Sequence, residues 1–152
     1  MAHQLIIDIE MQAASVTEPF PGIRELLGQL REHGAKLGVV TRNCRPAVLA
    51  TFPDLLDWVD VLTARGDCPY LKPDLRHARF CLDKMQIRPH RATMVGDGQL
   101  DMVLGRDLNM YCVGVLSGSS QADALVAKGA HHTLAQLSST TPLEALLAIS
   151  DQ

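Results

Sequence analysis

The feature that most constrains the fold of this chain is the alternation of short apolar runs with segments of helical character. The apolar runs have the length of buried strands and cover residues 36–41, 59–63, 92–96 and 111–116. The helical segments lie before, between and after them and cover residues 21–33, 45–52, 74–85, 99–108, 121–128 and 142–149. Strands joined through helices form parallel sheets with right-handed crossovers. We therefore expect an α/β fold, a doubly wound three-layer sandwich around a mostly parallel central sheet.

The length and composition predict one compact domain. The chain has 152 residues and no internal repeat or linker, so residues 1–152 are expected to form a single domain. Its net charge is -3 and its basic residues are scattered, which argues against a nucleic-acid partner. No apolar run approaches the ~20 residues of a membrane span, and the N-terminus lacks the basic flank of a signal peptide.

The cysteines favour a cytoplasmic location. Cys44, Cys68, Cys81 and Cys112 show no CxxC spacing, so we expect reduced thiols that behave as small hydrophobic side chains. His131 and His132 form a pair of metal-ligand type, but no third ligand is near them in the sequence. A role in a short edge strand or a loop is therefore the better interpretation of these two histidines.

The clearest chemical motif follows the apolar run at 92–96. Asp97 comes directly after this predicted strand, and Asp101 lies four residues later, one turn into the next helix. Gly96 and Gly98 allow the backbone to turn sharply at this point. Two carboxylates placed so close together predict a cation between them.

Two further residues complete an ordered set. Thr41 ends the apolar run at 36–41, and Lys72 stands before a proline at the mouth of the helix at 74–85. Hydroxyl, lysine and paired acids in this order resemble the second, third and fourth motifs of the haloacid dehalogenase (HAD) superfamily. The segments Pro21–Leu27, Val113–Val115 and Lys128–Leu134 also resemble members of the phosphoglycolate phosphatase type, so the resemblance covers roughly residues 20 to 148.

The resemblance implies a Mg²⁺-dependent phosphatase that hydrolyses phosphomonoesters through an aspartyl-phosphate, with a small phosphorylated metabolite as substrate. Asp8 would be the nucleophile, and Glu10 would be the general acid. Mg²⁺ would be held by Asp8, the Glu10 carbonyl and Asp97. In the same scheme Thr41 and Lys72 would contact the phosphoryl group. Asp101 would orient Lys72 or a metal-bound water.

The N-terminal segment departs from this pattern. The family's first motif reads DxDG(T/V), whereas Asp8 and Glu10 are followed here by Met11 and Gln12. The apolar residues of the segment fit a strand by alternation and a helix by their spacing, so periodicity leaves both interpretations open. The alternative to a phosphatase is therefore a catalytically silent or truncated HAD-like domain that lacks the nucleophile strand, with a binding role or none.

The intervals between the motifs leave no room for a cap domain. About ten residues follow the first motif before Pro21, and the interval of 31 positions from Thr41 to Lys72 is taken up by a helix and a strand. Capless members of the family that the chain resembles either oligomerise, so that a neighbour covers the site, or act on large substrates. From this resemblance we expect self-association. A receiver-type signalling domain is a further alternative, because it also combines acids, a Thr and a Lys. In a receiver domain the lysine follows the last functional strand, whereas Lys72 precedes Asp97. The order of these residues therefore argues against a receiver domain.

Overall fold

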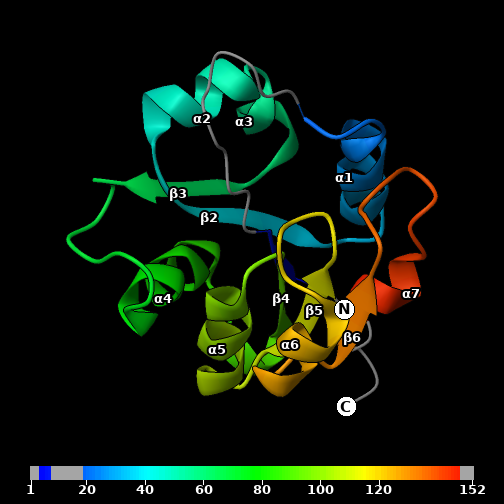
Figure 1. Cartoon of the computed structure of the whole chain (residues 1–152). Helices are drawn as coiled ribbons and strands as arrows, with labels where there is room; N and C mark the ends of the chain where they lie inside the picture. The colour runs from blue at the N-terminus through cyan, green and yellow to red at the C-terminus, as the bar shows by residue number, and fades with distance from the viewer. Residues whose placement is uncertain (1–3, 8–18, 148–152) are drawn as a thin grey trace.

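The computed structural model describes residues 4–7 and 19–147 (Figure 1). Strands and helices alternate through most of this part of the chain. In order they are β1 (Gln4–Ile7), α1 (Ile23–Glu32), β2 (Lys36–Cys44), α2 (Arg45–Thr51), α3 (Leu55–Trp58), β3 (Val61–Arg65), α4 (Leu75–Met85), η1 (Pro89–Arg91), β4 (Ala92–Gly96), α5 (Gln99–Asp107), β5 (Tyr111–Val115), α6 (Ala122–Ala127), β6 (His132–Leu134) and α7 (Leu143–Leu146).

The described strands form one sheet in the order β3-β2-β1-β4-β5-β6, and every described pair is parallel. This is a doubly wound order in which the chain starts at the centre and builds outward in both directions. β1 lies between β2 and β4, with Ile7 in register with Val39 on one side and Val95 on the other. The strand interpretation of the N-terminal segment is thus confirmed over Gln4–Ile7, and the helical one is wrong there.

Helices cover both faces of the sheet, which gives the expected three layers (Figure 1). One face is packed by α1, α2, α3 and α7, and the other by α4, α5 and α6. Side chains alternate along each strand, so Val39 enters the first core while its neighbour Val40 enters the second. The α/β prediction is therefore confirmed.

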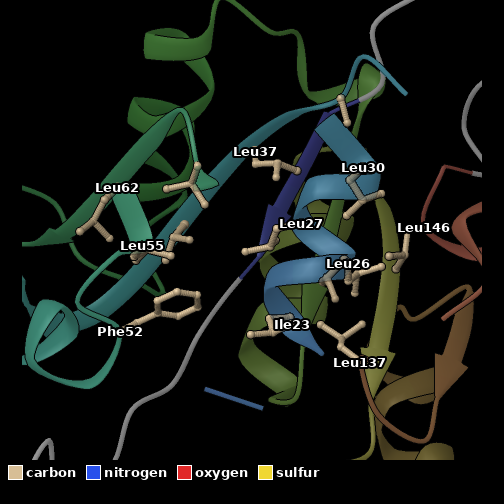
Figure 2. Packing of buried hydrophobic residues seen from close by; sticks show 14 of the residues in the cluster. Ile23, Leu26, Leu27, Leu30, Leu37, Phe52, Leu55, Leu62, Leu137 and Leu146 are labelled. Carbon is tan, nitrogen blue, oxygen red and sulfur yellow. The ribbon is translucent and has the colours of Figure 1, made fainter. Parts of the chain in front are cut away.

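The first core is built on α1. Leu26, Leu27 and Leu30 are almost wholly buried, and burial of each such side chain contributes about 1.5–3 kcal/mol. Figure 2 shows these leucines beside Leu137 and Leu146, with Phe52 on the side of α2 and α3. The second core contains Met94 and Met102 together with the buried faces of α4 and α6. The sheet is thus packed on both of its faces, and the loops that follow its strands lie at its edge.

Most predicted elements are confirmed within a few residues. The helix predicted at 74–85 begins at Leu75, with the Asp74 carboxylate accepting a hydrogen bond of 2.9 Å from the Arg76 N–H as a cap. β2 is longer than predicted and runs on to Cys44. The short elements α3 and η1 were not predicted, because three or four residues carry too little periodicity to be recognised.

The four cysteines are free thiols, as expected. Burial raises the pKa of Cys81 and of Cys112 to about 12, so both stay protonated and pack as small apolar side chains. Across residues 4–7 and 19–147, no helix is long and apolar enough to cross a membrane.

Candidate active site

Thr41 lies at the carboxyl edge of the sheet, within the last part of β2. Its side chain is buried, and its hydroxyl oxygen accepts a hydrogen bond of 3.1 Å from the Asn43 backbone N–H. The pairing of β2 with β3 shifts register between Val40 and Cys44, so the strand is irregular just where Thr41 stands. The hydroxyl therefore has a fixed position, and its own hydrogen can still be donated to a ligand.

Asp97 follows β4, whose residues are all buried. The loop after β5 lies against its carboxylate, because a Cβ on Gly118 would be only 2.6 Å from Asp97 Oδ2. Only glycine allows this close approach without displacing the acid. Asp97 is thereby placed between the end of β4 and the β5–α6 loop, at the same edge of the sheet as Thr41.

Lys72 and Asp101 form a buried ion pair. Lys72 Nζ lies 3.0 Å from Asp101 Oδ1, and the two side chains are 3% and 2% exposed. The second carboxylate oxygen accepts a hydrogen bond of 3.2 Å from the Gly98 N–H at the start of α5. A Cβ on Gly96 would lie 2.7 Å from Asp101 Cγ, so the glycine gives the acid its space. The pair thus joins the loop before α4 to the first turn of α5.

The Lys72 loop has a second anchor. The Lys72 backbone N–H donates a hydrogen bond of 3.1 Å to His77 Nδ1, in the first turn of α4. His77 is fully buried. Burial, with a smaller effect from the Lys72 charge, lowers the pKa of His77 to about 4. His77 could not be singled out from its sequence pattern, because a histidine on the inner face of a helix resembles an ordinary core residue.

The structure brings part of the predicted site together. Thr41 lies in β2 and Asp97 directly follows β4, the two strands that flank β1. Lys72 pairs with Asp101, one turn into the helix that follows Asp97. Asp8 and Glu10 lie outside the described residues. In the ranges 4–7 and 19–147, no three His, Cys, Asp or Glu side chains are grouped to hold a metal ion. Of the predicted ligands only Asp97 is described; its carboxylate is a hard oxygen donor that suits Mg²⁺, and a complete site needs Asp8 and Glu10 as well.

His131 and His132 have the structural role that was expected. His131 Nδ1 accepts a hydrogen bond of 3.0 Å from the Cys112 N–H, and its ring stacks on Tyr111 with 4.9 Å between the centroids. His132 begins the short edge strand β6. Because these contacts lie where β5 and β6 begin, His131 is at the edge of the sheet opposite Thr41 and Asp97.

The family model of haloacid dehalogenase-like hydrolases matches residues 1–115. This chain belongs to that family. The match includes β1, Thr41, Lys72 and the two acids after β4, and so it agrees with the motifs recognised in the sequence.

Curated relatives place this HAD chain near two kinds of phosphatase. It is 31% identical over 101 residues to a phosphoglycolate phosphatase of Nitrosospira multiformis, covering 64% of this chain and 44% of that protein. It is 30% identical over 112 residues to the pyrophosphatase PpaX of Bacillus pumilus, covering 72% of this chain and 51% of the relative. The chain therefore spans about half the length of the curated relatives that it matches.

Solved structures agree on the fold. CbbY from Rhodobacter sphaeroides in complex with phosphate superposes with a TM-score of 0.71 at 21% identity, over 82% of this chain and 57% of CbbY. A hydrolase from Pseudomonas syringae gives a TM-score of 0.71 at 24% identity, over 78% of this chain and 57% of that structure. The described sheet and helices thus have the core fold of larger HAD-like proteins.

Proposed function

We propose that this chain is a Mg²⁺-dependent phosphomonoester hydrolase that works through an aspartyl-phosphate on Asp8. The observation that carries the proposal is the buried Lys72–Asp101 pair at the carboxyl edge of the sheet. Two opposite charges removed from water contribute little to stability compared with apolar residues of the same size. Their presence at this edge of the sheet, which also carries Thr41 and Asp97, favours a role in binding an anion.

The first step of the proposed reaction is nucleophilic. β1 ends at Ile7, so Asp8 is the residue next in sequence after the central strand. A carboxylate oxygen of Asp8 would attack phosphorus in line, and the bond between phosphorus and the ester oxygen would break. Glu10 would give its proton to the departing alkoxide. A water molecule would then hydrolyse the acyl phosphate, which restores the Asp8 carboxylate and releases inorganic phosphate.

The described residues would bind the transferring phosphoryl group. The Thr41 hydroxyl would donate a hydrogen bond to one of its oxygens. Lys72, which donates a hydrogen bond to Asp101, would supply positive charge to the phosphoryl oxygens. Asp101 would keep the ammonium aimed at the site.

Asp8, the Glu10 carbonyl and Asp97 would hold Mg²⁺, which in such sites neutralises phosphate charge and orients the substrate. Like-charged carboxylates at 4 Å repel by about 4 kcal/mol at an effective dielectric of about 20, so acids gathered at this edge favour a bound cation. The position of Asp97 against Gly118 would keep its carboxylate from turning away.

The substrate would be a small phosphorylated metabolite. The relatives named above are a phosphoglycolate phosphatase and a pyrophosphatase, which makes 2-phosphoglycolate and inorganic pyrophosphate the first compounds to test. We also propose that the chain self-associates, because the intervals between its motifs leave no room for a cap. Analytical ultracentrifugation that shows only monomer at high protein concentration would contradict the proposed self-association.

The test is phosphate release from 2-phosphoglycolate, pyrophosphate and p-nitrophenyl phosphate, with Mg²⁺ and with EDTA. We expect Mg²⁺-dependent release by the unaltered chain and a loss of at least about a hundredfold in Asp97→Asn, as for other groups that stabilise the transition state electrostatically. Asp107→Asn is the control, because Asp107 is an exposed acid at the far end of α5. A folded chain that releases no phosphate under any condition would instead support the silent domain that the altered first motif suggests.

A further inference from the structure

We propose that His77 is a positioning residue that holds the backbone of Lys72 so that its ammonium reaches Asp101 and the phosphoryl site. The catalytic meaning of this proposal rests on the proposed phosphatase function. The contact between His77 and Lys72 does not rest on that function, because it can be measured in the folded chain without a substrate. His77 touches no reacting atom in this scheme and acts only through Lys72.

Lys72 is held at both of its ends. Its ammonium lies 3.0 Å from Asp101 Oδ1, and its backbone N–H lies 3.1 Å from His77 Nδ1. The loop around it closes on itself, since the Asp74 N–H donates to the Leu71 carbonyl at 3.0 Å. The His77 N–H in turn donates to the Asp74 carbonyl at 3.1 Å. The imidazole thus ties the lysine loop to the first turn of α4.

The contact requires a neutral imidazole with an unprotonated Nδ1, because a nitrogen that carries a hydrogen cannot accept the Lys72 N–H. The charged groups that act on His77 are Asp67 and Asp74, which favour its protonation, and Lys72, which opposes it. Burial acts in the same direction and is the largest cause of the lowered pKa of His77, which is about 4. The ring is therefore neutral near pH 7, with its proton on Nε2.

An apolar side chain could fill the same volume but could not replace the acceptor. His77 is fully buried and Lys72 is 3% exposed, so water has little access to the Lys72 N–H. A buried donor that loses its acceptor either stays unsatisfied or moves to find another partner. Movement of the loop would shift the ammonium, and shifts of about 1 Å in a catalytic group can lower rates by ~100-fold.

The experiment compares three substitutions of His77 with one matched control. In His77→Asn the Oδ1 atom lies as many bonds from Cα as Nδ1 does, so the acceptor is restored. His77→Gln places its oxygen one bond further out, and His77→Leu has no acceptor. The control is His131→Leu, which removes the same kind of bond, from the Cys112 N–H at 3.0 Å, at the opposite edge of the sheet.

Two measurements need no substrate. Amide hydrogen exchange at Lys72 is expected to rise about tenfold or more in His77→Leu and in His77→Gln, while His77→Asn stays within about threefold of the unaltered chain. The ¹⁵N resonance of the Lys72 ammonium is expected to move toward that of a solvated lysine in His77→Leu and in His77→Gln. It should not move in His77→Asn or in His131→Leu.

The kinetic measurement is kcat and KM for p-nitrophenyl phosphate with Mg²⁺. We expect kcat to fall about tenfold or more in His77→Leu with a smaller change in KM, to recover in His77→Asn, and to stay unchanged in His131→Leu. If His77→Leu does not fold, the difference between the Asn and Gln variants decides the outcome.

An unchanged Lys72 ammonium resonance in the folded His77→Leu and His77→Gln variants would overturn the positioning role. So would equal losses of kcat in His77→Asn and His77→Gln. If the unaltered chain shows no hydrolysis, the proposed function fails. The resonance and exchange data still decide whether His77 positions Lys72.

Discussion

The buried pair of Lys72 and Asp101 leads to a quantitative prediction for stability. Lys72→Met removes the ammonium and leaves the Asp101 carboxylate almost wholly buried, with the hydrogen bond that its Oδ2 accepts from the Gly98 N–H. Removing one member of a buried ion pair costs about 3–5 kcal/mol, because the other charge stays buried without compensation. We expect the free energy of unfolding to fall by that amount in Lys72→Met, and by a similar amount in Asp101→Leu.

The magnitude follows from the distance between the charges. At 3.0 Å and an effective dielectric of about 20, the Coulomb attraction is about 5.5 kcal/mol. The cost of removing both charges from water offsets most of this gain. The double variant Lys72→Met with Asp101→Leu should therefore lose less than the sum of the two single losses. The coupling energy should lie near the upper part of the ~0.5–3 kcal/mol range for residues in contact.

The assay is urea unfolding followed by the fluorescence of Trp58, the only tryptophan in the chain. Asp107→Asn is the matched control, since its ion pair with Arg106 is about half exposed and such pairs contribute about 0–1 kcal/mol. If the free energy of unfolding falls by less than about 1 kcal/mol in Lys72→Met, the reasoning is refuted. It is also refuted if the losses of the two single variants simply add in the double variant, because the two charges would then not be coupled.

Further predictions concern the edge of the sheet and His77. Gly118→Ala should lower phosphatase activity about tenfold or more, because the new Cβ would displace the end of the Asp97 side chain. Stability should change little, and measuring both kcat and the midpoint of urea unfolding checks the two expectations. Thr41→Val should also lower kcat, because it removes the hydroxyl. The free energy of unfolding should fall as well, because the hydrogen bond from the Asn43 N–H to the Thr41 hydroxyl oxygen is lost. The pKa of His77 falls from 6.5 to about 4 on folding, so between these values the unfolded chain binds more protons. Stability should therefore rise with pH in that window by up to about 1.4 kcal/mol per pH unit, and His77→Asn should flatten the rise.

Much of the fold could be predicted because helices and strands leave periodic patterns. The apolar run predicted at 92–96 and the helix predicted at 74–85 correspond closely to β4 and α4. The N-terminal segment was ambiguous because Leu5, Ile7 and Ile9 alternate as in a strand while other apolar residues fit a helix. Pairing of β1 with two neighbouring strands resolves this ambiguity for Gln4–Ile7, and such long-range pairing cannot be seen in local periodicity.

The site could be predicted only in part. Lys72 and Asp101 were recognised from the order of motifs, and their 3.0 Å contact agrees with the orienting role expected for Asp101. His77 was not recognised, because its importance depends on which of its nitrogens faces the Lys72 N–H. The roles of Asp8 and Glu10 remain predictions, since both lie outside the residues that the structure describes.

The most direct test of the proposed phosphatase is Mg²⁺-dependent hydrolysis of p-nitrophenyl phosphate by the purified chain and by its Asp8→Asn variant. The two proteins should unfold at similar urea concentrations, so that a difference in rate reports chemistry. We predict hydrolysis by the unaltered chain that EDTA abolishes and that Asp8→Asn reduces to the buffer background. Equal rates for the two proteins, or no hydrolysis by either, would contradict the proposal that Asp8 is the nucleophile of a working phosphatase.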